Sequence, residues 1–195
     1  MDSAVDELSA ILIAYELVAR NTWPDLHPAL AGRAERRSGG TEVQLRAELA
    51  AYLNEARPPR SNVRIFWKLG PGFAFGGCNE SFAKDAGMKS PAEMVGLDDF
   101  DKRLPWRHQA AKYRRDDKNV VNAGTSNLDF VERQEAPDGS TAWVRVGKVP
   151  IKTATGAIIG LLGMYEMLDP TVGRELFGKA MASEKKPKSE RPELG

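Results

Sequence analysis

The chain has 195 residues, of which 28 are lysine or arginine and 27 are aspartate or glutamate, so its formal net charge is +1. A chain of this length buries about 70% of its unfolded surface, which is enough for one domain with short extensions. Because a balanced charge does not attract polyanions or anionic lipids, we expect neither a nucleic-acid partner nor a membrane partner.

Cys78 is the only cysteine, which excludes an internal disulfide and fits a reducing compartment. The first apolar run, residues 8–18, follows acidic residues and is interrupted by Glu16. This run is too short to cross a bilayer, and it lacks the basic start of a signal peptide. We therefore expect a cytoplasmic protein.

The spacing of apolar residues predicts two amphipathic helices ahead of the first strand, one over residues 5–20 and one between Thr41 and Pro58. Their apolar positions are Val5, Leu8, Leu12, Tyr15 and Ala19 in the first helix, and Leu45, Leu49, Tyr52 and Leu53 in the second. Two helices alone bury little apolar surface, so each needs a partner. The following sheet and a second copy of the chain are equally suitable partners.

Residues 63–69 and 73–78 are rich in strand-forming residues. The Gly70-Pro71-Gly72 segment between them predicts a turn and therefore a hairpin. Asn79 suits the N-cap of a short helix over residues 81–86, because its side-chain oxygen can accept a backbone hydrogen bond. We favour this capping role over contact with a ligand.

A second short helix and then a longer one are predicted after the hairpin. Ser90 and Glu93 have the spacing of a capping box at the start of the second short helix. Pro105 suits the first turn of the long helix, and Gly124 suits its end. The apolar face of the long helix carries Trp106, Ala110, Tyr113, Val120 and Val121, and its basic face carries Arg107, Lys112, Arg115 and Lys118.

From Thr125 onward, apolar residues recur with a period of two, which predicts three consecutive strands. Leu128 and Phe130 are expected to share one face of the first strand. The next two strands are expected over residues 143–151 and 157–168, after turns at residues 136–140 and 153–156. Gly160 and Gly163 in the last strand indicate a close backbone approach or a bulge.

This order of elements resembles a PAS domain over residues 63–171. Residues 77–83 resemble the second strand and first helix of the family, and residues 169–171 resemble its closing acid-x-threonine signal, with proline in the middle. Further similar patterns are Trp106 with Tyr113, Arg114 and Asp117 in the long helix, and Pro137-Asp138-Gly139 before Trp143. The resemblance implies an α+β fold: a five-stranded antiparallel sheet with helices on one face, preceded by N-terminal helices.

The resemblance also implies a division of the chain and a role. Residues 1–60 form a helical extension for dimerisation or signalling, residues 61–171 form the sensor domain, and residues 172–195 hold a weak helix over residues 172–181 and then a tail expected to be disordered. PAS domains sense a small ligand, a cofactor or a redox state and relay the change through flanking helices and dimer contacts. No kinase, cyclase or helix-turn-helix pattern is present, so we expect a homodimer and a downstream signalling protein as partners of a bacterial sensor.

We expect a ligand pocket between the sheet and the long helix. Large aromatic side chains pack cores, and in this fold they would also line such a cavity. The candidate residues are Phe82, Trp106, Tyr113, Arg114, Asp117, Phe130, Trp143 and Met164. Asp117 lies on the apolar face, three positions after Arg114, where a buried carboxylate needs a paired charge or hydrogen bonds. A structural ion pair is the favoured interpretation of Asp117.

No cofactor is the favoured expectation, with haem and flavin as open alternatives. Some PAS sensors bind haem through a histidine in this helical segment, but His108 lies off the apolar face and fits a solvent-facing position. Flavin photochemistry needs a cysteine in a helical motif, whereas Cys78 precedes the first short helix and fits a small buried residue. No histidine or cysteine pair has metal-ligand spacing, so we expect no metal site.

Two other functions compete with sensing. A small acid–base enzyme would use Asp117 and Tyr113, and it would need a polar cavity beside a strongly perturbed Asp117. A nucleic-acid-binding adaptor would use the basic face of the long helix and the lysine-rich tail, although a solvated face explains those charges more simply. We expect binding rather than catalysis.

Overall fold

A computed structural model describes residues 3–26, 39–54, 62–135 and 138–184. The helices are α1 (Ser3–Thr22), α2 (Glu42–Asn54), α3 (Glu80–Asp85), α4 (Ala110–Ala123) and α5 (Pro170–Glu184). The strands are β1 (Arg64–Leu69), β2 (Ala74–Cys78), β3 (Asn127–Glu135), β4 (Thr141–Lys152) and β5 (Ile158–Met167). They form one five-stranded antiparallel sheet in the order β2-β1-β5-β4-β3, which confirms the predicted fold class.

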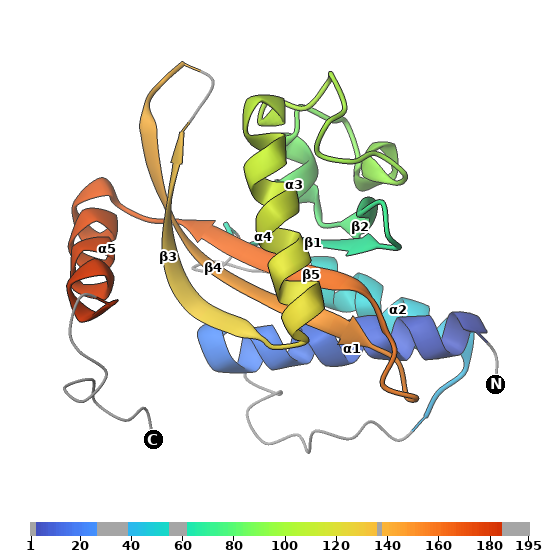
Figure 1. Cartoon of the computed structure of the whole chain (residues 1–195). Helices are drawn as coiled ribbons and strands as arrows, with labels where there is room; N and C mark the ends of the chain where they lie inside the picture. Colours follow the sequence, from blue (N-terminus) through green and yellow to red (C-terminus); the bar gives the residue numbers. More distant parts are fainter. Residues whose placement is uncertain (1–2, 27–38, 55–61, 136–137, 185–195) are drawn as a thin grey trace.

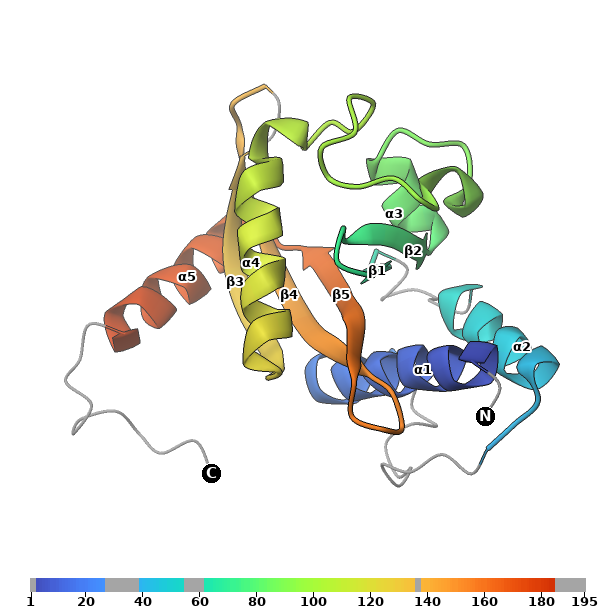
Figure 2. The ribbon, with the colours of Figure 1, turned by 45° about the vertical axis from the view of Figure 1, so that its right-hand side comes forward.

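The helices α3 and α4 lie on one face of this sheet (Figures 1 and 2). Figure 2 shows α4 running across β4 and β5, which are the central and most extensively paired strands. Phe66, Phe75, Phe82 and Leu161 are buried in the apolar cluster on this face. We call the face of the sheet that α3 and α4 cover the concave face.

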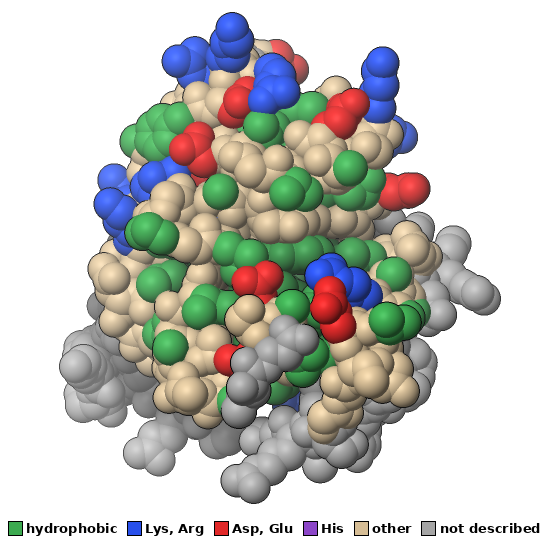
Figure 3. Space-filling view, turned by 90° about the vertical axis from the view of Figure 1, so that its right-hand side faces the viewer, with side chains coloured by type: hydrophobic (Ala, Val, Ile, Leu, Met, Phe, Trp, Pro, Cys, Tyr) green, Lys and Arg blue, Asp and Glu red, His purple; other side chains and the backbone are tan. Residues whose placement is uncertain are grey.

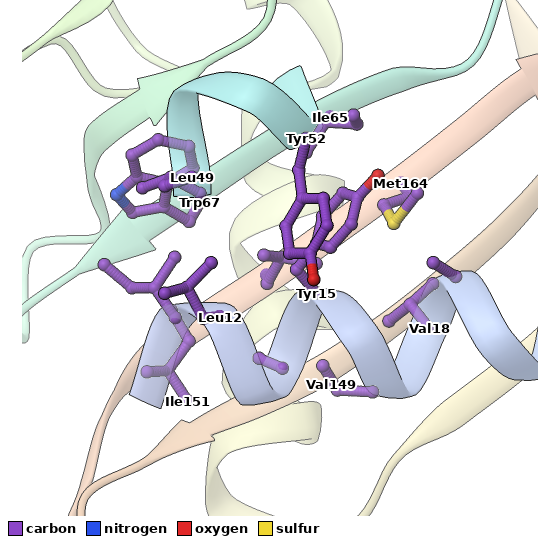
Figure 4. Packing of buried hydrophobic residues seen from close by; sticks show 14 of the residues in the cluster. Leu12, Tyr15, Val18, Leu49, Tyr52, Ile65, Trp67, Val149, Ile151 and Met164 are labelled. Carbon is purple, nitrogen blue, oxygen red and sulfur yellow. The ribbon is translucent and has the colours of Figure 1, made fainter. Parts of the chain in front are cut away.

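The helices α1 and α2 cover the opposite face of the sheet. Leu12, Tyr15 and Val18 of α1 are fully buried, and Figure 4 shows them among side chains of the strands, including Val149 and Met164. Because α1 buries its apolar face on the sheet of its own chain, it needs no second copy to be stable.

Polar and apolar residues do not alternate simply along the central strands, because both faces of the sheet are covered. On β5, Leu161 belongs to the concave-face cluster, whereas Leu162 and Met164 belong to the α1 cluster. On β4, Val146 faces the concave side and Val149 faces α1. A run of apolar residues in these strands therefore does not reveal which residue faces which side.

Asn79 caps α3 as predicted and also holds the start of β1. Its Oδ1 accepts hydrogen bonds from the backbone N–H groups of Phe82 and Ile65, each at 3.1 Å. Its Nδ2 donates to the Val63 carbonyl oxygen at 2.9 Å. One buried side chain thus joins the end of the first hairpin to the helix that follows it.

Two other helix boundaries were predicted correctly. The Thr41 Oγ1 accepts from the Gln44 N–H at 3.3 Å at the start of α2, and Gly124 ends α4 in the left-handed conformation, with φ of 64°. The start of α4 differs from the expectation at Pro105. A 3-10 turn over Arg107–Gln109 comes first, and α4 begins at Ala110.

The predicted capping box at Ser90 does not form. The helix here is a single 3-10 turn, Pro91–Met94, and Ser90 makes no side-chain cap hydrogen bond. The Glu93 carboxylate instead accepts from the Lys89 N–H at 2.9 Å, so it does not reach the Ser90 backbone as a capping box requires.

A bulge in β3 overturns the expectation that Leu128 and Phe130 share a face. Asp129 has a positive φ of 54°, and the pairing with β4 shifts between Asn127 and Phe130. Leu128 packs against the α1 cluster, whereas Phe130 lines a groove with residues of α4. The extra residue of a bulge breaks the two-residue period.

The last helix, α5, is longer than the predicted residues 172–181 and lies along β3 and β4 (Figure 1). Its Phe177 ring lies 5.2 Å from the Trp143 ring, and Gly173 is buried against the Trp143 side chain. The other side chains of α5 that the structure describes are exposed.

Charged side chains are concentrated over the segment between α3 and α4, at the top of Figure 3. Asp101 and Arg103 pair there, with Nε and Oδ1 2.8 Å apart. The same segment exposes two apolar side chains, Val95 and Phe100. No helix among the described residues is long and apolar enough to cross a membrane.

Some predictions lie outside the described residues. They are residues 32–38 of the polar, glycine-flanked loop expected before Thr41 over residues 32–40, the helix end at Pro58, the first two residues of the turn at 136–140, and the tail at residues 185–195.

Gly160 and Gly163 lie where β5 passes very close to β1. A Cβ at Gly160 would overlap the Lys68 carbonyl oxygen, and a Cβ at Gly163 would overlap the Phe66 ring. The predicted close backbone approach is therefore confirmed at Gly160, whereas at Gly163 the close neighbour is a side chain.

We expect Gly160→Ala to lower the free energy of unfolding by about 1–3 kcal/mol, because the β1 backbone must move to admit the methyl group. Gly178→Ala in α5 is the matched control, since nothing lies within 4 Å of the added carbon. Helix propensity should make the control neutral or stabilising by up to about 1 kcal/mol. Urea denaturation measures both, and equal losses would contradict the close approach.

Candidate functional site

A cavity of about 300 Å³ lies between the concave face of the sheet and the segment from α3 to α4. Its lining combines aromatic rings with charged side chains. The lining residues are Arg64, Phe66, Lys68, Phe75, Phe82, Asp85, Asp99, Pro105, Trp106, His108, Tyr113, Glu132, Gln134, Glu135, Ala142, Val146, Lys148, Tyr165 and Met167.

One wall of the cavity is a group of aromatic rings in mutual contact. The Phe82 ring of α3 lies 4.9 Å from the Phe66 ring, 5.4 Å from Trp106 and 6.2 Å from Tyr165, measured between ring centroids. Phe75 of β2 completes the group at 5.5 Å from Phe82. Rings from three strands, a helix and a loop thus form a continuous apolar wall.

Opposite charges form a buried cluster at the cavity. The Lys68 Nζ lies 2.6 Å from Oδ2 of both Asp99 and Asp117, and the Lys148 Nζ lies 3.0 Å from the Asp117 Oδ1. All four side chains are at least 92% buried, and Asp117 is wholly buried. The Trp106 Nε1 donates to the remaining Asp99 oxygen at 3.2 Å. We call Lys68, Asp99, Asp117 and Lys148 the charge cluster.

Within the charge cluster, the lysines keep Asp117 ionised. Desolvation by burial alone would raise the pKa of Asp117, but the charges of Lys148 and Lys68 and their hydrogen bonds outweigh it, and the pKa lies below its ordinary value. Burial alone would likewise lower the pKa of Lys148, yet Asp117 and Glu132 raise it above its ordinary value. The predicted structural ion pair of Asp117 is therefore confirmed, with lysines rather than Arg114 as partners.

A second ion pair lies at the edge of the cavity. The Arg64 guanidinium binds the Asp85 carboxylate through two hydrogen bonds, at 2.8 and 3.2 Å, and the Tyr165 hydroxyl donates to the same carboxylate at 2.9 Å. Burial, with the Asp85 charge, raises the pKa of Tyr165 well above its ordinary value. This hydroxyl therefore stays protonated and acts as a donor.

The predicted pocket residues divide into those that line the cavity and those that do not. Phe82, Trp106 and Tyr113 line it, and so does His108 at its exposed side. Asp117 lies behind the two lysines rather than in the lining.

Arg114, Phe130, Trp143 and Met164 lie elsewhere, so their assignment to this cavity is corrected. The Arg114 guanidinium lies over the rings of Phe73 and Phe100. Phe130 lines a separate groove between α4 and β3. Trp143 packs against α5 and Met164 packs under α1, because their positions in β4 and β5 alternate away from the concave face.

Lys68 and Lys148 are the site residues that sequence reasoning missed. Each lies in a strand beside buried apolar residues: Phe66 and Trp67 precede Lys68, and Gly147 and Val149 flank Lys148. A lysine inside such a strand must be paired when it is buried. That pattern could have identified both lysines and the need for acidic partners.

Haem and flavin–cysteine chemistry do not fit the residues present. Both ring nitrogens of His108 face backbone oxygens, Nδ1 at 3.1 Å from Pro105 and Nε2 at 3.3 Å from Glu135, so neither is directed at an iron atom. Cys78 is buried in the concave-face cluster outside the cavity lining, and burial raises the pKa of its thiol to about 12. Among the described residues, no group of three or more acidic, histidine or cysteine side chains could hold a metal ion.

Tyr113 and Asp117 do not pair with each other. The Tyr113 hydroxyl donates to the Gln109 Oε1 at 2.7 Å, whereas the Asp117 carboxylate binds the two lysines. Burial, together with the charges of Glu132, Asp99 and Asp116, raises the pKa of Tyr113 far above its ordinary value. Neither group has the pKa of an acid or base that exchanges protons near neutral pH.

Comparison with solved structures places the fold. The Vibrio cholerae VqmA dimer is similar with a TM-score of 0.52 and 21% identity, over 64% of this chain and 52% of that chain. An RNA-binding light-oxygen-voltage receptor is similar with a TM-score of 0.51 and 17% identity, over 76% of this chain and 40% of that chain. Light-oxygen-voltage domains are PAS domains. The chain has a PAS-like fold.

The PAS-like fold is shared with ligand-bound structures as well. VqmA bound to DPO matches with a TM-score of 0.51 and 20% identity, over 63% of this chain and 57% of that chain. The chain spans less than two thirds of each of these VqmA proteins. No family model matches the sequence, and no curated protein is significantly similar to it.

Proposed function

We propose that this chain is a cytoplasmic signalling module that binds a small organic molecule in the cavity on the concave face. The aromatic wall around a cavity of about 300 Å³, in a PAS-like fold, carries this proposal. Ligand pockets begin at about this size and combine apolar walls with a few polar groups. Solved structures of similar fold include VqmA described with DPO, which supports a small-molecule ligand for this fold.

The binding signal would pass to a second copy of the chain or to another signalling protein. Two observations support this part of the proposal. Apart from Gly173 and Phe177, the described side chains of α5 are exposed and available for contact. One similar structure is described as a VqmA dimer.

The module acts by binding rather than by catalysis. Asp117 is held as a carboxylate by two ammonium groups, and Tyr113 is held as a phenol, so the acid–base pair of the rival hypothesis has no member that titrates near neutral pH. The cavity supports recognition better than proton transfer.

Nucleic acid is a second partner class to measure, because one similar VqmA structure is described as a complex with DNA and a similar light-oxygen-voltage receptor is described as RNA-binding. On α4, Lys112 lies 3.5 Å from Asp116 and 3.6 Å from Glu132, which offsets part of the basic face. Oligonucleotide binding that weakens steeply with salt would support this partner.

Ala142→Phe tests the cavity directly. Ala142 is half-buried in the cavity lining, so a phenyl ring there should fill the site with little strain on the core. We expect mass spectrometry of the purified protein, exposed to a cell metabolite extract, to detect a bound small molecule in the wild type and at least tenfold less in Ala142→Phe.

Ala157→Phe is the matched control, because Ala157 is exposed in the turn between β4 and β5 and lies outside the cavity lining. It should retain the wild-type level of bound molecule. A wild-type protein that retains no molecule from the extract, or equal retention by both variants, would contradict the proposed site.

A further inference from the structure

We infer that the cavity selects uncharged, planar one- or two-ring compounds that present a hydrogen-bond acceptor, such as a ring nitrogen or a carbonyl oxygen, to Lys148. This inference rests on the proposed function and names the ligand class of the same site. Three properties of the lining lead to it: unused donors, balanced charge, and the shape and size of the apolar wall.

The charge cluster offers donors to a ligand but no free carboxylate oxygen. Both Asp117 oxygens accept from a lysine, and the two Asp99 oxygens accept from Lys68 and Trp106. An ammonium group carries three N–H donors. Among the described residues, the Lys148 Nζ uses one of them, on Asp117, whereas the Lys68 Nζ uses two.

Lys148 is the better placed of the two lysines to bind a ligand. The Lys68 Nζ lies over the rings of Phe66 and Phe75, at 5.5 and 5.0 Å, so its remaining charge already faces aromatic rings. Lys148 lines the cavity, and its side chain is 92% buried. A buried donor that stays unpaired is costly, so an acceptor on the ligand gains binding energy there.

The charges around the cavity favour an uncharged ligand over an anion. The two lysines of the charge cluster are balanced by two aspartates, and Arg64 is balanced by Asp85. Glu132 and Glu135 add negative charge to the lining. An anion entering the cavity would lose its hydration without meeting a net positive charge, which is unfavourable.

The aromatic wall and the volume set the shape. The rings of Phe66, Phe82 and Trp106 form a continuous surface suited to stacking with a planar molecule. A cavity of about 150 Å³ holds one benzene ring. The volume of about 300 Å³ therefore suits a compound of one or two rings.

The test uses three compounds with the same two-ring frame. Quinoline presents a ring nitrogen, naphthalene presents no acceptor, and 2-naphthoate carries a negative charge. Their dissociation constants are measured by ligand-detected nuclear magnetic resonance titration on the full chain. We expect Lys148→Met to weaken quinoline at least tenfold and to leave naphthalene within about twofold, since a bond from a charged donor contributes about 1.5–3 kcal/mol. In the wild type, 2-naphthoate should bind at least tenfold more weakly than quinoline.

Lys112→Met is the matched control, because Lys112 lies on α4 outside the cavity lining and should change neither affinity. If Lys148→Met does not fold, the lysine ammonium signals of the wild type give the same answer. Quinoline should shift a buried ammonium signal and naphthalene should not.

The outcomes separate the ligand class from the proposed function. The ligand class is wrong if 2-naphthoate binds best, or if Lys148→Met weakens quinoline and naphthalene equally. In either case, loss of probe binding in Ala142→Phe would still support the cavity as a binding site. If none of the three probes binds the wild type, the ligand class is wrong, and the extract experiment with Ala142→Phe decides separately whether the cavity is a binding site.

Discussion

Asp117→Asn is expected to lower the free energy of unfolding by about 3–5 kcal/mol, the usual cost of breaking a buried ion pair from one side. After the substitution, the buried lysines Lys68 and Lys148 have only one carboxylate left in the charge cluster, that of Asp99. Nearly the same shape is kept, so the loss reports charge rather than packing. Urea denaturation followed by circular dichroism measures it.

Asp116→Asn is the matched control one position away on α4. Asp116 is partly exposed and meets Lys112 at 3.5 Å and Arg115 at 3.9 Å, and pairs of this kind contribute at most about 1 kcal/mol. Adding Lys148→Met to Asp117→Asn restores the charge balance and should recover part of the lost stability. Equal losses at Asp116 and Asp117 would contradict the buried cluster.

The pH dependence gives an independent check of the Asp117 prediction. The pKa of Asp117 is lower in the folded protein than its ordinary value, so the carboxylate contributes stability above the unfolded pKa and loses it as pH falls through the folded pKa. The stability difference between wild type and Asp117→Asn should therefore be constant above about pH 5 and shrink below about pH 4. A difference that grows on acidification would contradict the assigned direction.

Leu12→Ala in α1 is expected to lower the free energy of unfolding by about 2–5 kcal/mol, because the side chain is fully buried and its loss leaves a cavity under the sheet. Figure 4 shows Leu12 between α1 and the sheet, near Trp67 and Ile151. The same denaturation assay measures the effect.

Ile13→Ala is the control, because it removes a side chain of equal size from the next residue of the same helix, where 41% of the surface is exposed. It should change stability by about 0.5 kcal/mol or less, as surface substitutions do. Comparable effects at the two positions would show that α1 is not part of the core and would revive a second copy of the chain as the partner of its apolar face.

Local sequence signals predicted the elements well. Asn79 and Gly124 have the side chain or the backbone freedom that a helix terminus needs, and both perform that role in the structure. The signals failed where a competing contact was available nearby. Glu93 reaches the Lys89 N–H instead of completing a capping box, and the bulge at Asp129 breaks the alternation in β3.

The candidate site was predicted less completely. Three of the predicted pocket residues line the cavity: Phe82 on α3, Tyr113 on α4, and Trp106 in the turn before α4. Trp143 and Met164, which lie on strands, do not line the cavity. They face the opposite side of the sheet, where α1, α2 and α5 cover it, so both faces of these strands are apolar. Burial on two faces removes the contrast from which a sequence pattern assigns a side.

Residues close together in the chain determine the order of strands and helices, because turns and helix ends depend on local backbone geometry. The local pattern around Asp117 likewise shows that this buried carboxylate needs a charged partner. The identity of that partner is not determined by residues near Asp117 in the chain. Lys68 and Lys148 lie 49 and 31 positions from Asp117 and reach it only because antiparallel pairing sets β1, β5 and β4 side by side beneath α4. Folding brings such distant residues together, and a local pattern that shows a buried charge needs a partner does not show which distant residue that partner is.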